Sequence, residues 1–225
     1  MKKFALTFVI AMLLYAVVSV PGCDKSRKIP NKIPSNFDYG SWTGSTYRND
    51  FFGFSITVPE NWYVSGDEDM KIKMDRAQDM DFVNNEEAKK QRKVADITTA
   101  NLLFTARYST EEAIKKQVSN PNIALIAENL PSGAQQIDRA KYVKAYRQGI
   151  SQVTPDLVIK SQTNKTIGGQ EFTSVEVQFS IQEVPIYQEH LICLKNDFAL
   201  CFALSSLDDS EKQQLDDIMA TLKWD

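Results

Sequence analysis

Histidine and cysteine are scarce in this chain, which excludes several kinds of metal and catalytic site. The 225 residues include one histidine, His190, and three cysteines. Zinc, haem and iron–sulfur sites draw mainly on these residue types. The patterns H-E-x-x-H, C-x-x-C and G-x-S-x-G are all absent. We therefore expect no catalytic, cofactor-binding or metal-ligating residue, no cofactor and no enzymatic activity. His190 falls in a predicted strand over 187–191, where we expect a half-exposed side chain.

Positive charge is not in excess either. The formal net charge is −3 at pH 7 and the sequence pI is about 5.4, whereas nucleic-acid-binding domains usually carry a basic face. We therefore expect no nucleic-acid partner. Hydrophobic residues make up 43% and charged residues 24% of the chain, which is typical of a globular protein. The length suits one domain with an additional segment.

The additional segment is at the N-terminus, where residues 1–22 have the layout of a secretory signal peptide. Lys2 and Lys3 precede an apolar run from Phe4 to Val18 that is interrupted only by Thr7. The run is shorter than the roughly 20 residues of a membrane-spanning helix.

The end of this leader resembles a bacterial lipobox. It reads Val20-Pro21-Gly22-Cys23, although proline is not the usual residue at its position. We predict that cleavage leaves Cys23 as an acylated N-terminus in the cell envelope. The resemblance to lipoproteins also suggests the inner membrane, because Asp24 follows the cysteine. The alternatives are an uncleaved anchor helix and a cleaved chain with a free thiol at Cys23.

Residues 23–41 are predicted to be the acylated N-terminus and a flexible tether. Residues 24–41 contain two prolines and no sustained apolar period. Basic residues outnumber acidic ones at the membrane end, so the tether could lie along anionic headgroups. An ordinary solvated linker is an equally good interpretation.

Residues 42–225 are predicted to form one folded domain of strands and helices. Val175, Val177 and Phe179 alternate with polar residues, as in a half-buried strand. Gly168-Gly169 and Asn196-Asp197 are typical of hairpin turns. The expected strands occupy 42–47, 51–58, 102–108, 123–127, 157–163, 175–181, 186–194 and 199–205.

Three helical regions accompany these strands. One or two helices are expected in 68–93, a second region begins at Asp138, and a third begins near Ser210, which has Gln213 at capping-box spacing. Short connections favour antiparallel pairing, with helices covering the sheet. The sequence therefore predicts an α+β domain.

Three segments of this domain resemble uncharacterised bacterial lipoproteins of the PsbP-like and DcrB-like (Mog-type) fold. They are Thr46–Trp62, Asn120–Leu130 and the Ile167–Phe172 hairpin. The resemblance covers about residues 42–225 and implies an α-β-α sandwich around a central antiparallel sheet. Relatives of this fold include an extrinsic photosystem subunit, a Ran-binding protein and envelope proteins. Most of them bind partners, and the resemblance supplies no catalytic motif.

Cys193 and Cys201 could form a disulfide, depending on the turn between them. A two-residue turn at Asn196-Asp197 would pair Cys193 with Leu200 and point the sulfurs to opposite faces. A three-residue loop through Phe198 would place the cysteines opposite each other. Export favours the disulfide, and buried free thiols are the alternative.

Acidic clusters are the remaining candidates for a ligand site. Asp67-Glu68-Asp69 and Asp79-Met80-Asp81 do not match an EF-hand loop. The first cluster, like Asp208-Asp209, is better explained as the start of a helix. The aromatic residues at the start of the domain are expected in the core or in hairpin packing, unless several prove exposed together and form a binding surface. They are Trp42, Tyr47, Phe51, Phe52, Phe54 and Trp62.

The sequence therefore favours a lipid-anchored, non-enzymatic envelope protein that binds or scaffolds another envelope protein. The alternative is a carrier of a small apolar ligand held between sheet and helix. A concave polar pocket would favour a ligand, and a flat apolar patch would favour a protein partner.

Overall fold

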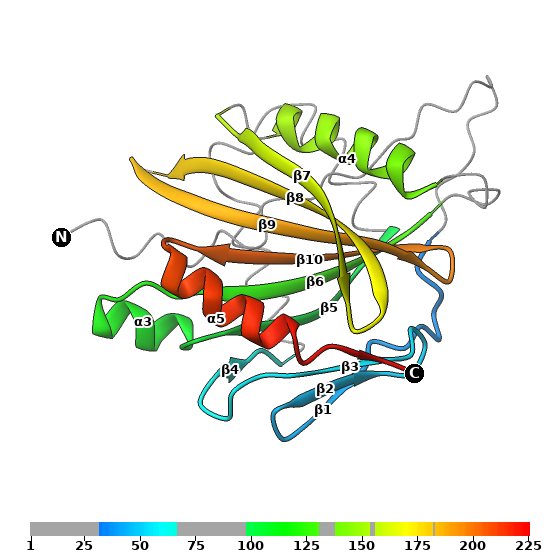
Figure 1. Ribbon diagram of the computed structural model, residues 1–225. Helices are drawn as coiled ribbons and strands as arrows, with labels where there is room; N and C mark the ends of the chain where they lie inside the picture. The colour runs from blue at the N-terminus through cyan, green and yellow to red at the C-terminus, as the bar shows by residue number, and fades with distance from the viewer. Residues whose placement is uncertain (1–31, 67–97, 131–137, 154–155, 182) are drawn as a thin grey trace.

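The central feature of the fold is a long, curved antiparallel sheet in the order β4-β5-β6-β10-β9-β8-β7 (Figure 1). The structure is a computed structural model that describes residues 32–66, 98–130, 138–153, 156–181 and 183–225. The predicted signal peptide, Cys23 and the helices expected in 68–93 lie outside these residues. The strands are β4 (Tyr63–Val64), β5 (Thr99–Ala106), β6 (Asn122–Asn129), β7 (Val158–Ile167), β8 (Gln170–Ile181), β9 (Val184–Lys195) and β10 (Phe198–Ser206).

The last four strands form the expected meander, whose turns follow from residue type. Gly168 and Gly169 connect β7 to β8 with φ angles of 57° and 86°. Asn196 and Asp197 connect β9 to β10 with φ angles of 51° and 63°. Positive φ at both central residues is the geometry that a two-residue hairpin turn requires, and glycine and asparagine tolerate it best.

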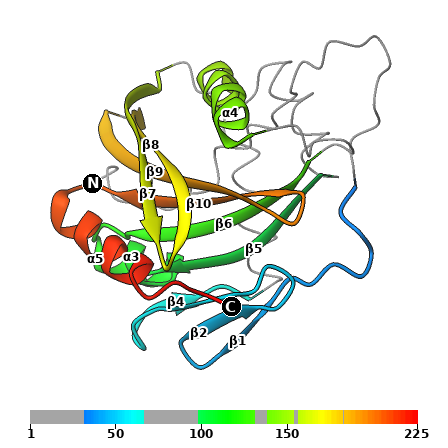
Figure 2. The same ribbon diagram turned by 45° about the vertical axis from the view of Figure 1, so that its right-hand side comes forward.

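Helices and a second sheet cover the two faces of the large sheet (Figures 1 and 2). Helix α4 (Arg139–Val153) packs on one face, where Tyr142, Val143 and Ile150 join Val175 and Val177 in one apolar cluster. Helix α5 (Asp209–Met219) and a four-stranded sheet lie on the other face. The expected α-β-α sandwich is therefore confirmed, with a small sheet sharing one outer layer. Among the described residues, no helix is long and apolar enough to cross a bilayer.

The small sheet has the order β1-β2-β3-β11 and joins the two ends of the domain. Its strands are β1 (Ser41–Thr43), β2 (Thr46–Asn49), β3 (Phe54–Thr57) and β11 (Lys223–Trp224). The hairpin expected near Arg48-Asn49-Asp50 turns later, at residues 50–53. The buried Asn49 side chain fixes this turn because its Oδ1 accepts a hydrogen bond from the Phe52 amide at 2.9 Å.

The prediction of a flexible tether is wrong for residues 33–40. These residues pack against the domain and are called the N-terminal strap below. Phe37 is buried, with its ring 5.3 Å from that of Phe198. Asp38 accepts hydrogen bonds from the amides of Gly40, Asp50 and Phe51. Aromatic packing and backbone hydrogen bonds together fix a segment whose composition alone is typical of a linker.

Two helix starts differ from expectation. Helix α5 is capped by Asp208, which accepts a hydrogen bond from the Glu211 amide at 2.9 Å, so the helix start expected at Asp208-Asp209 is confirmed and the cap expected at Ser210 lies two residues too late. Helix α3 (Thr110–Lys116), capped by Ser109, is additional. The helix that begins after Asp138 is confirmed, since this side chain accepts a hydrogen bond from the Lys141 amide at 2.7 Å.

Candidate functional site: a charged cleft beside helix α5

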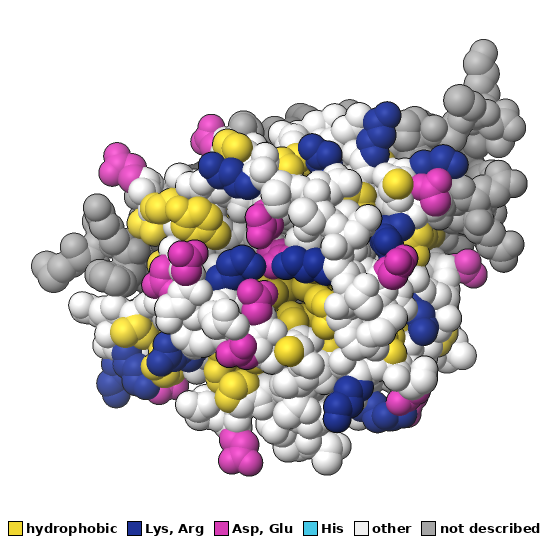
Figure 3. Space-filling model, in the orientation of Figure 1, with side chains coloured by type: hydrophobic (Ala, Val, Ile, Leu, Met, Phe, Trp, Pro, Cys, Tyr) yellow, Lys and Arg dark blue, Asp and Glu magenta, His cyan; other side chains and the backbone are white. Residues whose placement is uncertain are grey.

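A cleft of about 500 Å³ lies between helix α5 and strands β7–β10. Figure 3 shows a hollow near the centre of this face, with hydrophobic side chains inside it and charged side chains around it. Residues from four strands and one helix surround the hollow, so the fold assembles the cleft from distant parts of the sequence. They are Lys160, Glu176, Val177, Tyr187, Gln188, Glu189, Leu204, Ser206, Leu207, Asp208, Asp209, Lys212 and Leu215.

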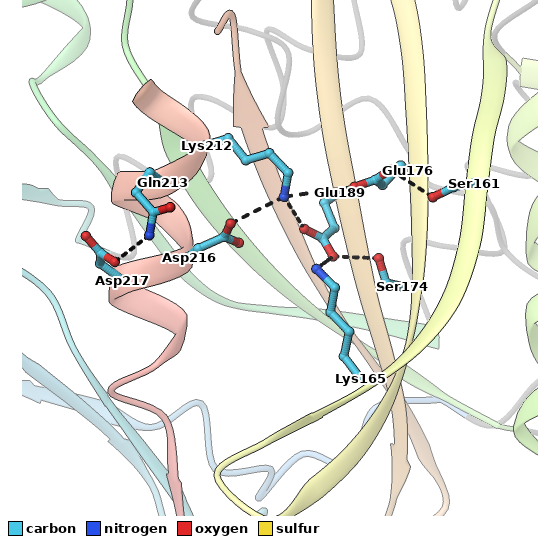
Figure 4. A network of polar contacts seen from close by, with 9 residues as sticks. All are labelled: Ser161, Lys165, Ser174, Glu176, Glu189, Lys212, Gln213, Asp216 and Asp217. Carbon is cyan, nitrogen blue, oxygen red and sulfur yellow. Dashed lines mark hydrogen bonds and ion pairs between the residues drawn. The ribbon is translucent and has the colours of Figure 1, made fainter. Parts of the chain in front are cut away.

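Glu189 is the buried centre of the polar contacts in this cleft (Figure 4). Its Oε1 accepts hydrogen bonds from Lys165 Nζ at 2.5 Å and Ser174 Oγ at 2.5 Å. Its Oε2 accepts one from Lys212 Nζ at 3.0 Å. Burial alone would raise the pKa of the Glu189 carboxyl, but these hydrogen bonds outweigh it and hold the pKa below its ordinary value. Glu189 is therefore an ionised anchor and is poorly suited to act as a general acid.

Lys212 brings the helix into this arrangement. Its Nζ also lies 3.4 Å from Asp216 Oδ2 and 3.9 Å from Glu176 Oε1. Partial burial lowers the pKa of Lys212, yet the hydrogen bond and charge of Glu189 and the charge of Asp216 raise it above its ordinary value overall. The ammonium group is therefore held in an environment with excess negative charge.

Glu176 is held less tightly than Glu189. Its Oε2 accepts a hydrogen bond from Ser161 Oγ at 2.8 Å, while the only contact of Oε1 within the described part of the chain is the long one with Lys212. The Glu176 side chain is 38% exposed, against 4% for Glu189. One carboxylate oxygen of Glu176 thus remains available to a bound molecule.

These charged residues were not identified as a site from the sequence. Glu176 was predicted only as part of the polar face of a strand, and Lys165, Glu189 and Lys212 were not singled out. They meet because β8 and β9 pair in a register that sets Glu176 opposite Glu189. The only sequence signal was acidic residues at strand positions on a face that a helix must cover.

The cysteines take the two-residue-turn arrangement, so the expected disulfide is wrong. Cys193 pairs with Leu200 and Cys201 pairs with Ile192. The two cysteines belong to the apolar clusters on opposite faces of the sheet, and both are free thiols. Burial raises the pKa of each thiol to about 12. Neither thiol is therefore poised for nucleophilic chemistry.

His190 lies in the predicted strand, but its side chain is fully buried, so the prediction of a half-exposed side chain is wrong. Its Nδ1 is 3.0 Å from the Tyr146 hydroxyl, and its Nε2 is 3.0 Å from Gln188 Oε1. An amide oxygen only accepts, so Nε2 carries the proton and Nδ1 accepts from Tyr146. Burial lowers the pKa of His190 to about 3. This neutral histidine fixes helix α4 to the sheet, where Tyr142 also donates to the buried Glu128 at 2.6 Å.

The other predicted site residues lie apart from the cleft or outside the described residues. The acidic clusters at 67–69 and 79–81 are outside them. Asp208-Asp209 starts α5, and Gly168-Gly169 forms a hairpin turn. Within the described ranges, no group of three or more histidine, cysteine, aspartate or glutamate side chains is arranged to hold a metal ion.

One aromatic residue of the N-terminal strap is exposed together with one from the β2–β3 turn. Tyr39 is 50% and Phe51 is 41% exposed. Their rings lie 5.2 Å and 5.4 Å from that of Phe37, so the two side chains form one aromatic patch. The neighbouring Tyr47, Phe52 and Phe54 are buried as expected.

No family model and no curated protein matches this chain. Among solved structures, the cyanobacterial PsbP protein (CyanoP) of Synechocystis sp. PCC 6803 superposes with a TM-score of 0.51 at 11% sequence identity, covering 83% of this chain and 96% of that one. LpqN, described as involved in cell envelope biogenesis of Mycobacterium tuberculosis, gives a TM-score of 0.43 at 13% identity, covering 81% and 86%.

The immunity protein TplEi of the Pseudomonas aeruginosa T6SS gives a TM-score of 0.38 at 10% identity, covering 77% of this chain and 96% of that one. The likeness to CyanoP confirms the predicted PsbP-like fold. The two lower scores support no inference, and similarity to DcrB stays a prediction.

Proposed function

We propose that this protein is a bacterial lipoprotein whose PsbP-like domain is a non-enzymatic binding module at the membrane surface. In this proposal, residues 1–22 are removed and Cys23 carries the lipid. Asp24 favours retention in the inner membrane.

The observation that carries the proposal is the sequence Val20-Pro21-Gly22-Cys23 shortly before the folded domain. Only residues 24–31 separate Cys23 from the first described residue, Lys32. Fully extended, they reach at most about 30 Å. A lipid at Cys23 would therefore hold the domain close to the bilayer.

The anchor is tested by metabolic labelling with an alkyne-tagged palmitate in a bacterial host. We expect the wild-type chain to be labelled and to sediment with membranes, whereas Cys23→Ser loses the label and keeps its leader. Cys193→Ala is the matched control, because it removes a buried thiol and should leave labelling unchanged. An unlabelled wild-type chain of full precursor mass would disprove the anchor.

Partner binding is supported by the aromatic patch of Tyr39 and Phe51, since paired exposed aromatic side chains are typical of protein interfaces. We propose that an envelope protein contacts this patch. A photo-crosslinking amino acid at Phe51 should give one discrete protein adduct in intact cells. The same group at Ile114, which is 45% exposed on α3, should not. Crosslinking of Phe51 to lipid alone would instead assign the patch to the membrane surface and reject the protein partner.

A second candidate function, binding of a small molecule, is favoured by the cleft beside α5. It lies between sheet and helix, as the carrier interpretation requires, and its volume of about 500 Å³ suits a small ligand. Its charged walls do not suit a purely apolar ligand.

A further inference from the structure

We propose that the cleft beside α5 binds an organic monocation, namely a single ammonium group joined to an apolar body. The inference rests on the second candidate function, because it names the chemical class of the ligand for that cleft. It follows from the balance of charge, the free carboxylate oxygen and the apolar floor.

The charge of the network in Figure 4 is unbalanced. Two ammonium groups, those of Lys165 and Lys212, face three carboxylates, those of Glu176, Glu189 and Asp216. Asp217, which Figure 4 also shows, accepts a hydrogen bond from Gln213 instead and is not counted in this group. The formal charge of this group is therefore −1. Charges beside low-dielectric walls interact more strongly than charges in water, so one further cation in the cleft is favoured.

Glu176 is the carboxylate that this cation would meet. Glu189 is satisfied by two lysines and a serine, whereas the nearest ammonium to Glu176 Oε1 lies at 3.9 Å. That distance is too long for a hydrogen bond. A ligand ammonium could approach Oε1 and complete the hydrogen bonding that Ser161 provides to Oε2.

The apolar part of the ligand is set by the floor of the cleft. Leu204 of β10 and Leu215 of α5 are buried side chains that line the cleft, and Leu207 continues this surface. Tyr187 lies beside them and is 42% exposed. An aryl or short alkyl group would cover these side chains while its ammonium remains at Glu176. A small inorganic cation would leave this apolar surface uncovered.

Charges at the mouth of the cleft do not correct the imbalance. Asp208 is engaged as the cap of α5. Lys160 and Asp209 also line the cleft, are exposed and have opposite charges. Lys160 is an exposed cation that would compete with the ligand for the carboxylates, so its removal should strengthen binding.

The test compares three water-soluble ligands of one shape and different charge. They are 2-phenylethylammonium, 2-phenylethanol and 3-phenylpropanoate. Each is titrated calorimetrically into the full chain in lipid nanodiscs, with empty nanodiscs subtracted. We expect saturable binding of the ammonium compound, binding of the alcohol weaker by about tenfold, and no saturable binding of the carboxylate.

Variants assign the preference to the cleft. Glu176→Gln should reduce ammonium binding to the level of the alcohol, and Lys160→Gln should tighten it by about twofold to threefold. Glu171→Gln is the matched control, because it removes a carboxylate from the same strand outside the cleft and should change nothing. Thermal melting of each variant verifies that the domain is folded.

Each remaining outcome overturns a defined part of the proposal. If the alcohol or the carboxylate binds as tightly as the ammonium compound, the cleft binds ligands but not cations preferentially. If Glu176→Gln keeps the preference, the cation lies elsewhere. If no compound binds at millimolar concentration, small-molecule binding fails as well, while the lipoprotein proposal is judged separately by labelling of Cys23.

Discussion

Glu189 on β9 and Lys212 on α5 form a 3.0 Å ion pair that fastens the C-terminal helix to the large sheet. Lys165 of β7 binds the same carboxylate from the other side, so one buried acid connects two strands and a helix. The floor of the cleft is fixed by this connection, because Leu215 follows Lys212 by one helical turn. The cleft is therefore part of the packing of the domain.

Replacing Glu189 with glutamine should destabilise the domain. The two lysines would lose their shared counter-ion in a partly buried site, at a cost of about 2 kcal/mol in the free energy of unfolding. Glu171→Gln, which removes a carboxylate whose side chain is 74% exposed, should cost less than about 0.5 kcal/mol. Chemical denaturation of both variants measures the difference, and equal effects would contradict a structural role for Glu189.

Acid should remove the contribution of Glu189. Its pKa is lower in the folded than in the unfolded chain. As the pH falls, the Glu189 carboxyl is therefore protonated in the unfolded chain before it is protonated in the folded chain. The free energy of unfolding that Glu189 contributes is lost as the pH falls below about 4.3. The wild type should lose more stability than Glu189→Gln over this acid range.

Much of the fold follows from local sequence, while the cleft does not. Alternation of apolar and polar residues is a property of each strand, and the two-residue turns follow from glycine, asparagine and aspartate. The meander was therefore predictable. The meeting of Lys165, Glu189 and Lys212 depends on pairing register and helix position, which no local pattern contains.

The missed or shifted elements have local physical causes. Helix α3 has only seven residues, too few for a clear apolar period, although Ser109 and the following acidic residues could have indicated it. The sequence offers two starts for α5 because both Asp208 and Ser210 are good caps. Glu211 decides between them, since its buried carboxylate accepts from the Leu207 amide at 2.8 Å. Strand β11 has two residues and is defined only by pairing with β3.

His190 should also make the stability of the domain depend on pH, in a range above the one in which Glu189 acts. Its pKa is about 3 in the folded chain and about 6.5 when unfolded, so between these values the unfolded chain binds more protons. Stability should therefore fall on acidification from about pH 6.5, by up to about 1.4 kcal/mol per pH unit.

The histidine is tested with His190→Gln, whose amide can still accept from Tyr146 and donate to Gln188. The slope of unfolding free energy against pH, measured between about pH 6 and pH 4.5, should be shallower in the variant. Identical slopes would show that folding does not lower the pKa of His190.

The two buried cysteines should behave as inert free thiols. With the pKa of each raised to about 12, almost no thiolate exists at neutral pH. A thiol reagent should modify Cys193 and Cys201 slowly in the native chain and quickly in denaturant. Intact mass under non-reducing conditions should show both thiol hydrogens. A mass lower by two hydrogens would show that Cys193 and Cys201 form a disulfide.

Adjacent glycines in the β7–β8 turn should differ sharply in their tolerance of alanine. Both have positive φ, which costs a residue with a Cβ about 1 kcal/mol. A Cβ at Gly168 would also clash with the backbone carbonyl oxygen of Leu222, whereas a Cβ at Gly169 would meet no atom within 4 Å. Gly169→Ala should therefore lower the free energy of unfolding only by the cost of holding alanine at positive φ. Gly168→Ala should cost clearly more, because it must move the hairpin away from the chain that leads to β11. Denaturation of the pair isolates this contact, and equal losses would show that the hairpin and the C-terminal segment are not packed together.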